Sequence, residues 1–249
     1  MNWLNYTLSG CVVEINKRQQ IRFLPNFARL ADDRALPILL SVGVAQLVGY
    51  DGQRPIQIQR RSIMGLPAVK PASYDDILAL PERLVGEIIR GVLRTHPRPA
   101  PKHALAYSSL GVELGGPFQR GRNGPGGWWI LDEPELHLGA DVLVPDLAGW
   151  KRARMPHLPD AAWFELAPDW ICEILSPATA KIDRAEKLPL YAHNGVAHCW
   201  LADPDLKTLE VFENHDGKWL LLTVLENDAS VSQPPFDAIA FDLASLWAD

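Results

Sequence analysis

Apolar runs of strand length, separated by Gly, Pro, Asn and Asp, occupy most of the chain from residue 73 onward. Short runs of this kind, bounded by turn residues, are typical of buried β-strands. We expect strands at residues 85–93, 128–138, 141–144, 169–175 and 198–202. A hairpin is expected from 208–213 and 219–225, joined by a turn at Asp216-Gly217.

Helices are fewer, and their end signals are clear. We expect them at residues 73–80, 99–114, 188–194 and 242–247. Ser73 followed by Asp76 resembles a capping box for the first helix. Pro189 lies in the first turn of the third, where a missing N–H is harmless, and Asn194-Gly195 ends it. Strands interrupted by helices predict an α/β fold with a sheet as its core.

Two segments predict connections rather than strands or helices. Residues 115–127 are rich in glycine but lack the Lys-Ser/Thr pair of a phosphate-binding P-loop, so we interpret them as a flexible loop. Residues 151–165 form a long polar connection that contains Pro156 and Pro159.

Residues 1–63 differ from the rest in pattern. They include a basic run at 17–22 and an apolar run at 35–48 that has no sustained period. Met64, by contrast, opens a stretch that resembles an ordinary protein start. We therefore expect one domain at 64–249, with 1–63 an N-terminal extension that arises from an upstream start. The alternative is a genuine N-terminal arm.

Composition is that of a globular protein whose charge is unevenly distributed. The 249 residues are 47% hydrophobic and 22% charged, with a net charge of −6. Residues 1–63 hold 8 Lys+Arg against 4 Asp+Glu, which leaves a net charge of −10 for residues 64–249. Acidic domains are poor non-specific nucleic-acid binders, which counts against a DNA nuclease. Metal-binding carboxylates would add negative charge, however, and Lys151-Arg152-Ala-Arg154 is a local basic stripe.

Several other classes of protein are disfavoured. The three cysteines are widely spaced and form no CxxC, so neither a disulfide framework nor a thiolate zinc site is indicated. The seven histidines show no HxH or HExxH spacing, which disfavours a zinc hydrolase. No apolar run reaches the length of a membrane span, and no signal-peptide pattern is present. We expect a cytoplasmic protein that does not bind membranes.

Three residues carry the candidate chemistry: Asp146, Glu173 and Lys187. Both carboxylates lie in or at the ends of apolar runs, and Lys187 lies at the entrance of the 188–194 helix. Carboxylate oxygens suit Mg²⁺, which polarises phosphate and activates water. Singly, the aspartate also fits a turn and the lysine a solvated surface. A glutamate inside an apolar run is harder to dismiss, because burying a carboxylate without a partner is costly.

Five short motifs in order resemble the PD-(D/E)XK nuclease superfamily and, within it, the Uma-two family of restriction-endonuclease-like proteins. They are Val144-Pro-Asp146, Pro168-Asp169-Trp-Ile-Cys-Glu173-Ile-Leu-Ser-Pro177, Lys187-Leu-Pro-Leu-Tyr191, Asn194-Gly195-Val196 and Trp200-Leu-Ala-Asp203-Pro204. The likeness covers residues 64–247. It implies a restriction-endonuclease-like α/β fold, with a central mixed sheet flanked by helices, and a divalent-metal site for Mg²⁺ or Mn²⁺.

The resemblance also implies roles for particular residues. Asp146 stands for the signature aspartate and Glu173 for its acidic partner, and both would bind the metal. The signature lysine, two positions after the glutamate, is replaced by Leu175, so Lys187 is the substitute. Glu87 matches a glutamate that opens an early family motif, and we expect it at the rim of the site.

Other positions fit the family less clearly. Arg90 occupies a place where the early motif usually has Asp. His103 matches a frequent family histidine, but a packing or surface role is equally consistent. Asp169 fits the start of a strand better than a metal ligand.

Three functions follow as hypotheses. The first is an Mg²⁺-dependent endonuclease that hydrolyses DNA, with Asp146, Glu173, Lys187 and Glu87 in the site and a homodimer as its assembly. The second is a catalytically inactive binding or regulatory protein on the same scaffold, which would use the surface around Trp128-Trp129 and residues 150–163. The third is a hydrolase of small phosphodiesters.

Overall fold

The computed structural model describes residues 70–97 and 99–247, together with the backbone of five strands nearer the N-terminus. It divides into two compact units, Met1–Ala68 and Val69–Asp249. The first unit holds an antiparallel sheet of β1 (Trp3–Leu8), β2 (Cys11–Asn16) and β3 (Ile21–Phe23), and a pair of β4 (Gly49–Asp51) and β5 (Arg54–Ile56). The apolar run 35–48, most of the basic run 17–22 and Met64 lie outside the described residues.

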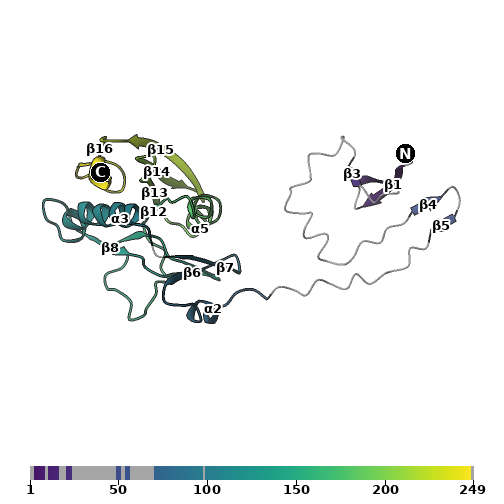
Figure 1. The fold of residues 1–249 in the computed structure, drawn as a ribbon, viewed down its shortest axis with the longest axis horizontal. Helices are drawn as coiled ribbons and strands as arrows, with labels where there is room; N and C mark the ends of the chain where they lie inside the picture. The colour runs from purple at the N-terminus through teal and green to yellow at the C-terminus, as the bar shows by residue number, and fades with distance from the viewer. Residues whose placement is uncertain are drawn as a thin grey trace. The chain divides into compact units, whose positions relative to one another are not determined.

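The second unit is built around a six-stranded mixed sheet (Figure 1). Its strands, in spatial order, are β15 (Lys218–Glu226), β14 (Thr208–His215), β13 (His198–Asp203), β12 (Trp170–Ile174), β11 (Leu147–Lys151) and β8 (Trp128–Asp132). Only β12 and β13 are parallel; every other neighbouring pair in this sheet is antiparallel. The mixed sheet and the C-terminal hairpin of β14 and β15 confirm the predicted architecture.

A four-stranded antiparallel sheet accompanies the six-stranded one. Its order is β7 (Val92–Pro97), β6 (Leu84–Ile89), β10 (Asp141–Leu143) and β9 (Leu136–Leu138). A short pair, β16 (Ser230–Val231) and β17 (Phe241–Asp242), lies near the C-terminus.

In the part of the chain that the structure describes, all helices but one are short. They are α2 (Tyr74–Leu78), α3 (Pro101–Leu114) with its π-helical continuation η2 (Gly115–Gln119), α4 (Ala180–Ile182), the π-helical turn η3 (Asp183–Lys187), α5 (Leu188–His193) and the 3₁₀ turn η4 (Leu243–Leu246). The predicted capping box is present, because the Asp76 carboxylate accepts a hydrogen bond of 2.7 Å from the Ser73 N–H. Among the described residues, no helix is long and apolar enough to cross a membrane.

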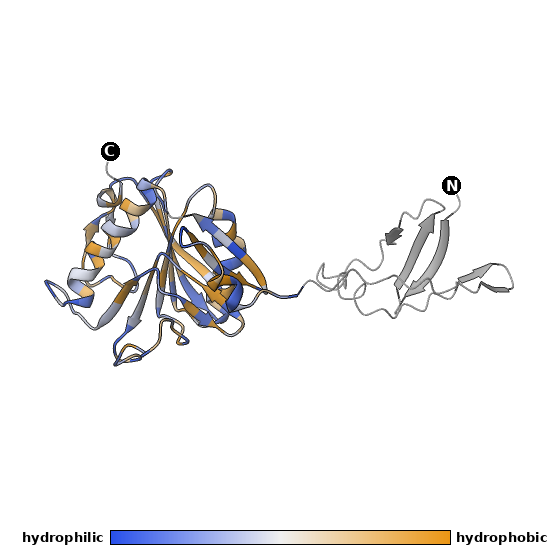
Figure 2. Ribbon diagram, turned by 60° about the horizontal axis from the view of Figure 1, so that its bottom comes forward, coloured by the Kyte–Doolittle hydropathy of each residue, from blue (hydrophilic) through white to orange (hydrophobic). Residues whose placement is uncertain are grey.

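The two faces of the six-stranded sheet bury separate hydrophobic clusters. On one face, α3 and the C-terminal segment, which includes Phe236, pack over alternate residues of the central strands, among them Trp170, Cys172 and Trp200. On the other, α5 and the smaller sheet pack over the intervening residues, including Trp150, Ile171 and Leu201. Figure 2 shows hydrophobic residues along the central strands and hydrophilic ones at the loops. Cys172 and Cys199 are buried free thiols, one in each hydrophobic cluster.

Several predicted elements differ from the structure. The expected strand 85–93 is a hairpin of β6 and β7, because Arg90 and Gly91 adopt φ values of 52° and 75° and reverse the chain. The expected strand 128–138 is also two strands, which lie in different sheets, and Glu133 in the break has a φ of 44°. The first part of the glycine-rich loop extends helix α3 as η2. Strand β11 was not predicted at all.

Candidate active site

The two predicted metal ligands lie next to each other across a pair of neighbouring strands. Glu173 lies in β12, whose five residues are all buried. Asp146 directly precedes β11, and in the antiparallel register Leu147 faces Cys172. The Asp146 carboxylate is held there because its Oδ2 accepts a 2.7 Å hydrogen bond from the Ile174 N–H. The structure therefore brings the two carboxylates to the same end of this strand pair.

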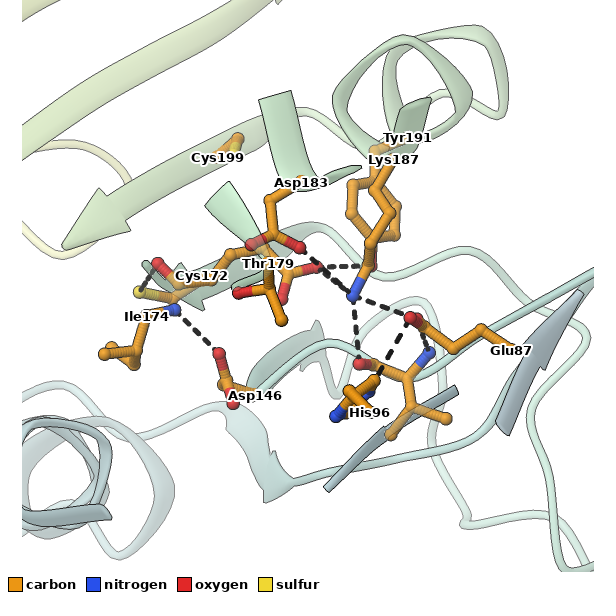
Figure 3. A network of polar contacts seen from close by, with 12 residues as sticks. Glu87, His96, Asp146, Cys172, Ile174, Thr179, Asp183, Lys187, Tyr191 and Cys199 are labelled. Carbon is orange, nitrogen blue, oxygen red and sulfur yellow. Dashed lines mark hydrogen bonds and ion pairs between the residues drawn. The ribbon is translucent and has the colours of Figure 1, made fainter. Parts of the chain in front are cut away.

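Lys187 reaches the same point from η3 (Figure 3). Its Nζ lies 2.9 Å from Oε1 of Glu173 and 2.9 Å from Oε1 of Glu87, and it donates to the Val144 carbonyl at 3.2 Å. The side chain is only 3% exposed. A lysine from a helical segment thus occupies the place between carboxylates that was predicted for the missing strand lysine. It lies within the helical segment 180–193 rather than at its entrance.

Glu87 lies inside the group of polar side chains around Lys187, which we call the cluster, and not at its rim. The prediction of a place at the rim was therefore wrong. It extends from β6 and is 2% exposed. Its Oε1 accepts a 2.8 Å hydrogen bond from the Val144 N–H as well as the contact from Lys187. His96 of β7 places Nε2 3.8 Å from the other oxygen, Oε2. Glu87 therefore links the smaller sheet to the segment that leads into Asp146.

Two residues of this cluster were missed by the sequence analysis: Asp183 and Tyr191. The Tyr191 hydroxyl donates a 2.7 Å hydrogen bond to Oε1 of Glu173. Asp183 is buried in the first position of η3, with Oδ1 3.8 Å from Nζ of Lys187. Tyr191 closes the motif that begins at Lys187, and Asp183 precedes Lys187 by one helical turn, but neither position by itself indicated a contact with Glu173.

His103 contacts the exposed side of the cluster. It lies near the start of α3, and its Nε2 is 3.3 Å from Oδ1 of Asp146. Its Nδ1 is buried and has no hydrogen-bond partner among the described residues. The His103 and Asp146 side chains are 13% and 16% exposed, against 3% for Lys187. Access from solvent is therefore on the side of His103 and Asp146.

The cluster holds more negative than positive charge, and the pKa values reflect this. Burial raises the pKa of Glu173 well above its ordinary value; the Lys187 ammonium opposes this shift, and the neighbouring carboxylates add to it. Burial likewise raises the pKa of Asp183. For Lys187, burial favours the neutral amine, but the surrounding carboxylates outweigh it and raise its pKa well above the ordinary value. For His103, burial also favours the neutral form, and the carboxylate of Asp146 outweighs it and raises the pKa.

The donor set fits a hard divalent cation. Asp146, Glu173 and Asp183 offer only oxygen, and Mg²⁺ typically takes one or two protein carboxylates and completes its shell with waters and phosphate. The excess carboxylate charge is a further feature that a bound cation would offset. Within residues 70–97 and 99–247, no three His, Cys, Asp or Glu side chains are arranged to hold a metal ion by themselves. Asp146 and Glu173 are the two carboxylates that the sequence predicted as metal ligands, and this assignment stays a prediction.

Comparison with solved structures gives a match of the same architecture. It is the crystal structure of a putative nuclease belonging to DUF820 from Anabaena variabilis ATCC 29413, which is 26% identical to this chain. The TM-score is 0.58, and the match covers 71% of this chain and 98% of that one. No curated protein matches the chain.

A comparison with protein families gives one match over most of the second unit. The model of the family Uma2, described as putative restriction endonuclease, matches residues 74–244, a range that includes every residue of the cluster. The family and the structural likeness together support a nuclease function, with nucleic acid as the substrate. They also confirm the predicted restriction-endonuclease-like α/β fold. The chain belongs to the Uma2 family of putative restriction endonucleases.

Proposed function

We propose that this protein is a divalent-metal-dependent endonuclease that hydrolyses phosphodiester bonds of DNA, with its catalytic domain at residues 64–249. The observation that carries the proposal is the buried ammonium of Lys187, held 2.9 Å from both Glu173 and Glu87. Burying charges is costly, so such a cluster needs a strong reason to persist. Together with Asp146 it supplies the carboxylates and the cation that phosphodiester hydrolysis requires.

Asp146 and Glu173 would hold the metal, Mg²⁺ or Mn²⁺. When bound, the ion supplies Lewis acidity toward a phosphate oxygen and lowers the pKa of a coordinated water. The backbone N–H of Ile174 orients Asp146 at 2.7 Å, and the Tyr191 hydroxyl orients Glu173 at 2.7 Å. Fixed carboxylates of this kind need no rearrangement when charge develops in the transition state.

Lys187 acts through its charge. Its raised pKa keeps it protonated at neutral pH, so it does not accept a proton from the attacking water. The ammonium instead offsets the charge of the buried carboxylates and attracts the negative charge that develops on the phosphate. Glu87 and the Val144 carbonyl fix its position from the side of the smaller sheet.

His103 orients Asp146 from the solvent side. Its Nε2 contacts Oδ1, while Oδ2 is already bound to the Ile174 N–H. A carboxylate held on both oxygens keeps one orientation toward the entrance of the site.

The direct test is cleavage of supercoiled plasmid by the purified full chain with Mg²⁺ or Mn²⁺. We expect nicking that EDTA abolishes and that both Glu173→Gln and Asp146→Asn reduce by at least about 100-fold, the scale of losing one electrostatic group in a site. Glu226→Gln, at an exposed position of β15, is the matched control and should cleave normally. Metal-dependent cleavage that persists in Asp146→Asn would overturn the assignment of the site.

One observation favours the second hypothesis, a catalytically inactive binding or regulatory protein. Oε1 of Glu173 already has two partners, Lys187 and Tyr191, which compete with any metal for that oxygen. If calorimetry shows no binding of Mg²⁺ or Mn²⁺ and the plasmid stays intact, the inactive scaffold is the better account. Metal binding without plasmid cleavage, but with hydrolysis of bis(p-nitrophenyl) phosphate, would indicate the small-phosphodiester hydrolase.

We also propose a homodimer, because cleavage of both strands of a duplex is simplest with two equivalent sites related by a two-fold axis. Light scattering coupled to size-exclusion chromatography tests this directly. A mass of one chain, 27.7 kDa, across micromolar concentrations would contradict it.

A further inference from the structure

The second unit is acidic, yet two of its segments carry only positive charge. Residues 115–130 and 147–159 contain five arginines and lysines and no aspartate or glutamate. The five are Arg120, Arg122, Lys151, Arg152 and Arg154, and all are exposed. Neither segment contributes a cation to the cluster around Lys187, so this charge has no part in the site described above.

The fold brings the two segments together at the end of β11 away from Asp146. Lys151 pairs in register with Trp128 of β8. The Arg152 N–H donates to the Gly127 carbonyl at 2.8 Å, and its guanidinium donates to the Gln119 carbonyl at 3.1 Å. These bonds hold the loop that carries Arg120 and Arg122 against the end of the strand. The cations therefore form one surface.

Two of the cations are fixed in place by aromatic rings. The Arg152 guanidinium lies 3.9 Å from the centroid of the Trp129 ring and also donates to the Trp128 carbonyl at 3.1 Å. The Lys151 ammonium lies 5.6 Å from the centroid of the Trp128 ring. Stacking of this kind orients a cation without neutralising it.

Within the described part of the chain, four of the five cations on this surface also lack an acidic partner. Among the described residues, Arg154 forms an ion pair, at 3.0 Å with Asp169, whereas Arg120, Arg122, Lys151 and Arg152 form none. Four positive charges without an acidic partner on an acidic domain indicate an external anion.

We propose that Arg120, Arg122, Lys151 and Arg152 bind the phosphate backbone of a DNA duplex whose scissile phosphate lies at the Asp146 cluster. This inference rests on the proposed function and adds the position of the DNA duplex on the protein. Asp146 precedes β11 and Lys151 ends it, so the two are five residues apart along an extended strand, or about 17 Å. At 3.4 Å per base pair, that is about five base pairs of duplex.

A duplex accounts for this surface better than an isolated phosphate group does. The four cations are spread over a loop and a strand end and so match a line of phosphates. Lys151 ends the strand that begins next to Asp146, and a polyanion long enough to reach both places gains both sets of contacts. Backbone contacts of this kind hold a duplex in register and do not read its sequence.

Binding is tested on the full chain, with a fluorescent 30-base-pair duplex in EDTA so that no turnover occurs. The variant Arg122→Glu/Lys151→Glu removes two phosphate contacts. Each contact contributes about 0.9 to the slope of log Kobs against log salt, so the slope should fall by about 2 and the affinity by about 60-fold at 0.1 M salt. The control, Lys70→Glu/Lys218→Glu, changes net charge equally at exposed positions elsewhere and should bind like the unaltered chain.

A second variant tests the same surface in case the first variant does not fold. Arg120→Gln/Arg122→Gln lies wholly in the exposed loop and should also lower the slope by about 2, with an unchanged melting temperature. We call these two double variants the patch variants. The proposal would be overturned if they bound the duplex with the same affinity and slope as the unaltered chain, or if the control lost as much affinity as they do. Stronger binding to phosphatidylserine vesicles, with no competition from DNA, would also overturn it and assign the surface to a membrane.

Hydrolysis of bis(p-nitrophenyl) phosphate separates this proposal from the proposed function. The patch variants should hydrolyse this small diester at the normal rate, because it is too short to reach the patch. If the patch variants lose DNA binding but the unaltered protein cleaves neither substrate, the DNA-binding surface is supported and the nuclease function is refuted. If the unaltered protein cleaves plasmid and the patch variants bind DNA as well as it does, the nuclease function is supported and the DNA-binding surface is refuted.

Discussion

Removing the charge of Lys187 is expected to be the most destabilising single change in the cluster. In Lys187→Met the buried carboxylates of Glu87 and Glu173 lose a cation at 2.9 Å, and Asp183 loses one at 3.8 Å. Deleting one member of a buried ion pair costs about 3–5 kcal/mol of unfolding free energy. We expect a loss in that range at pH 8.

The loss should shrink at lower pH, and the sign follows from the pKa shifts. The raised pKa of Lys187 means that its stabilising contribution is fully present below the pKa of an unfolded lysine, about 10.4. Without it, the already raised pKa of Glu173 should rise further above the unfolded value of about 4.3. Destabilisation then grows as pH rises above about 4.3, so the variant should lie closer to the unaltered protein at pH 5 than at pH 8.

Urea denaturation followed by tryptophan fluorescence at pH 5 and pH 8 measures both effects. Lys181→Met, at an exposed lysine of the same helical segment, is the control and should change stability by less than about 0.5 kcal/mol. The double variant Glu173→Gln/Lys187→Met should recover part of the loss, because it no longer buries that unpaired carboxylate. A loss below about 1 kcal/mol at pH 8, with no pH dependence, would refute the electrostatic account of this cluster.

Three further predictions concern single contacts. Tyr191→Phe removes the 2.7 Å hydrogen bond to Glu173 and should cost about 1.5–3 kcal/mol by the same denaturation assay; an unchanged midpoint would contradict this. Mg²⁺ binding should release protons at any pH where Glu173 is still protonated, because burial raises the pKa of Glu173 and a cation lowers it; calorimetry over a pH series in buffers of different ionisation enthalpy detects this, and identical enthalpies at every pH would argue against it. Gly124→Ala would place a Cβ 2.4 Å from Cβ of Pro117 and should lower stability by about 1–3 kcal/mol, whereas Gly116→Ala, whose Cβ would meet no atom within 4 Å beyond its chain neighbours and its own helix backbone, should be nearly neutral in thermal unfolding.

The central residues of the site were predictable because their local context is unusual. A glutamate within the apolar run 169–175 demanded a partner, and the nearby motifs indicated where to look for one. The structure brings Glu173, Asp146, Lys187 and Glu87 together, as predicted. Their catalytic roles stay predictions.

The errors arise where tertiary contacts override local pattern. Strand β11 was missed because it begins after Pro145-Asp146 and contains Gly149, features of a turn, and only pairing on both sides makes it a strand. The hairpin at Arg90 was missed because a non-glycine residue takes a positive φ there. Burial of Glu87 depends on the contact with Lys187, one hundred residues later, which no local pattern contains.

The helical origin of Lys187 has a consequence for recognising related enzymes from sequence. A search for glutamate and lysine two positions apart on one strand passes over this chain, since Leu175 occupies the second position. The three side chains that surround Glu173 from the helical segment are Asp183, Lys187 and Tyr191, spaced four residues apart. A strand glutamate followed by Asp-x₃-Lys-x₃-Tyr is therefore a geometric signature for this arrangement of the site, and it can be sought in chains that lack the strand lysine.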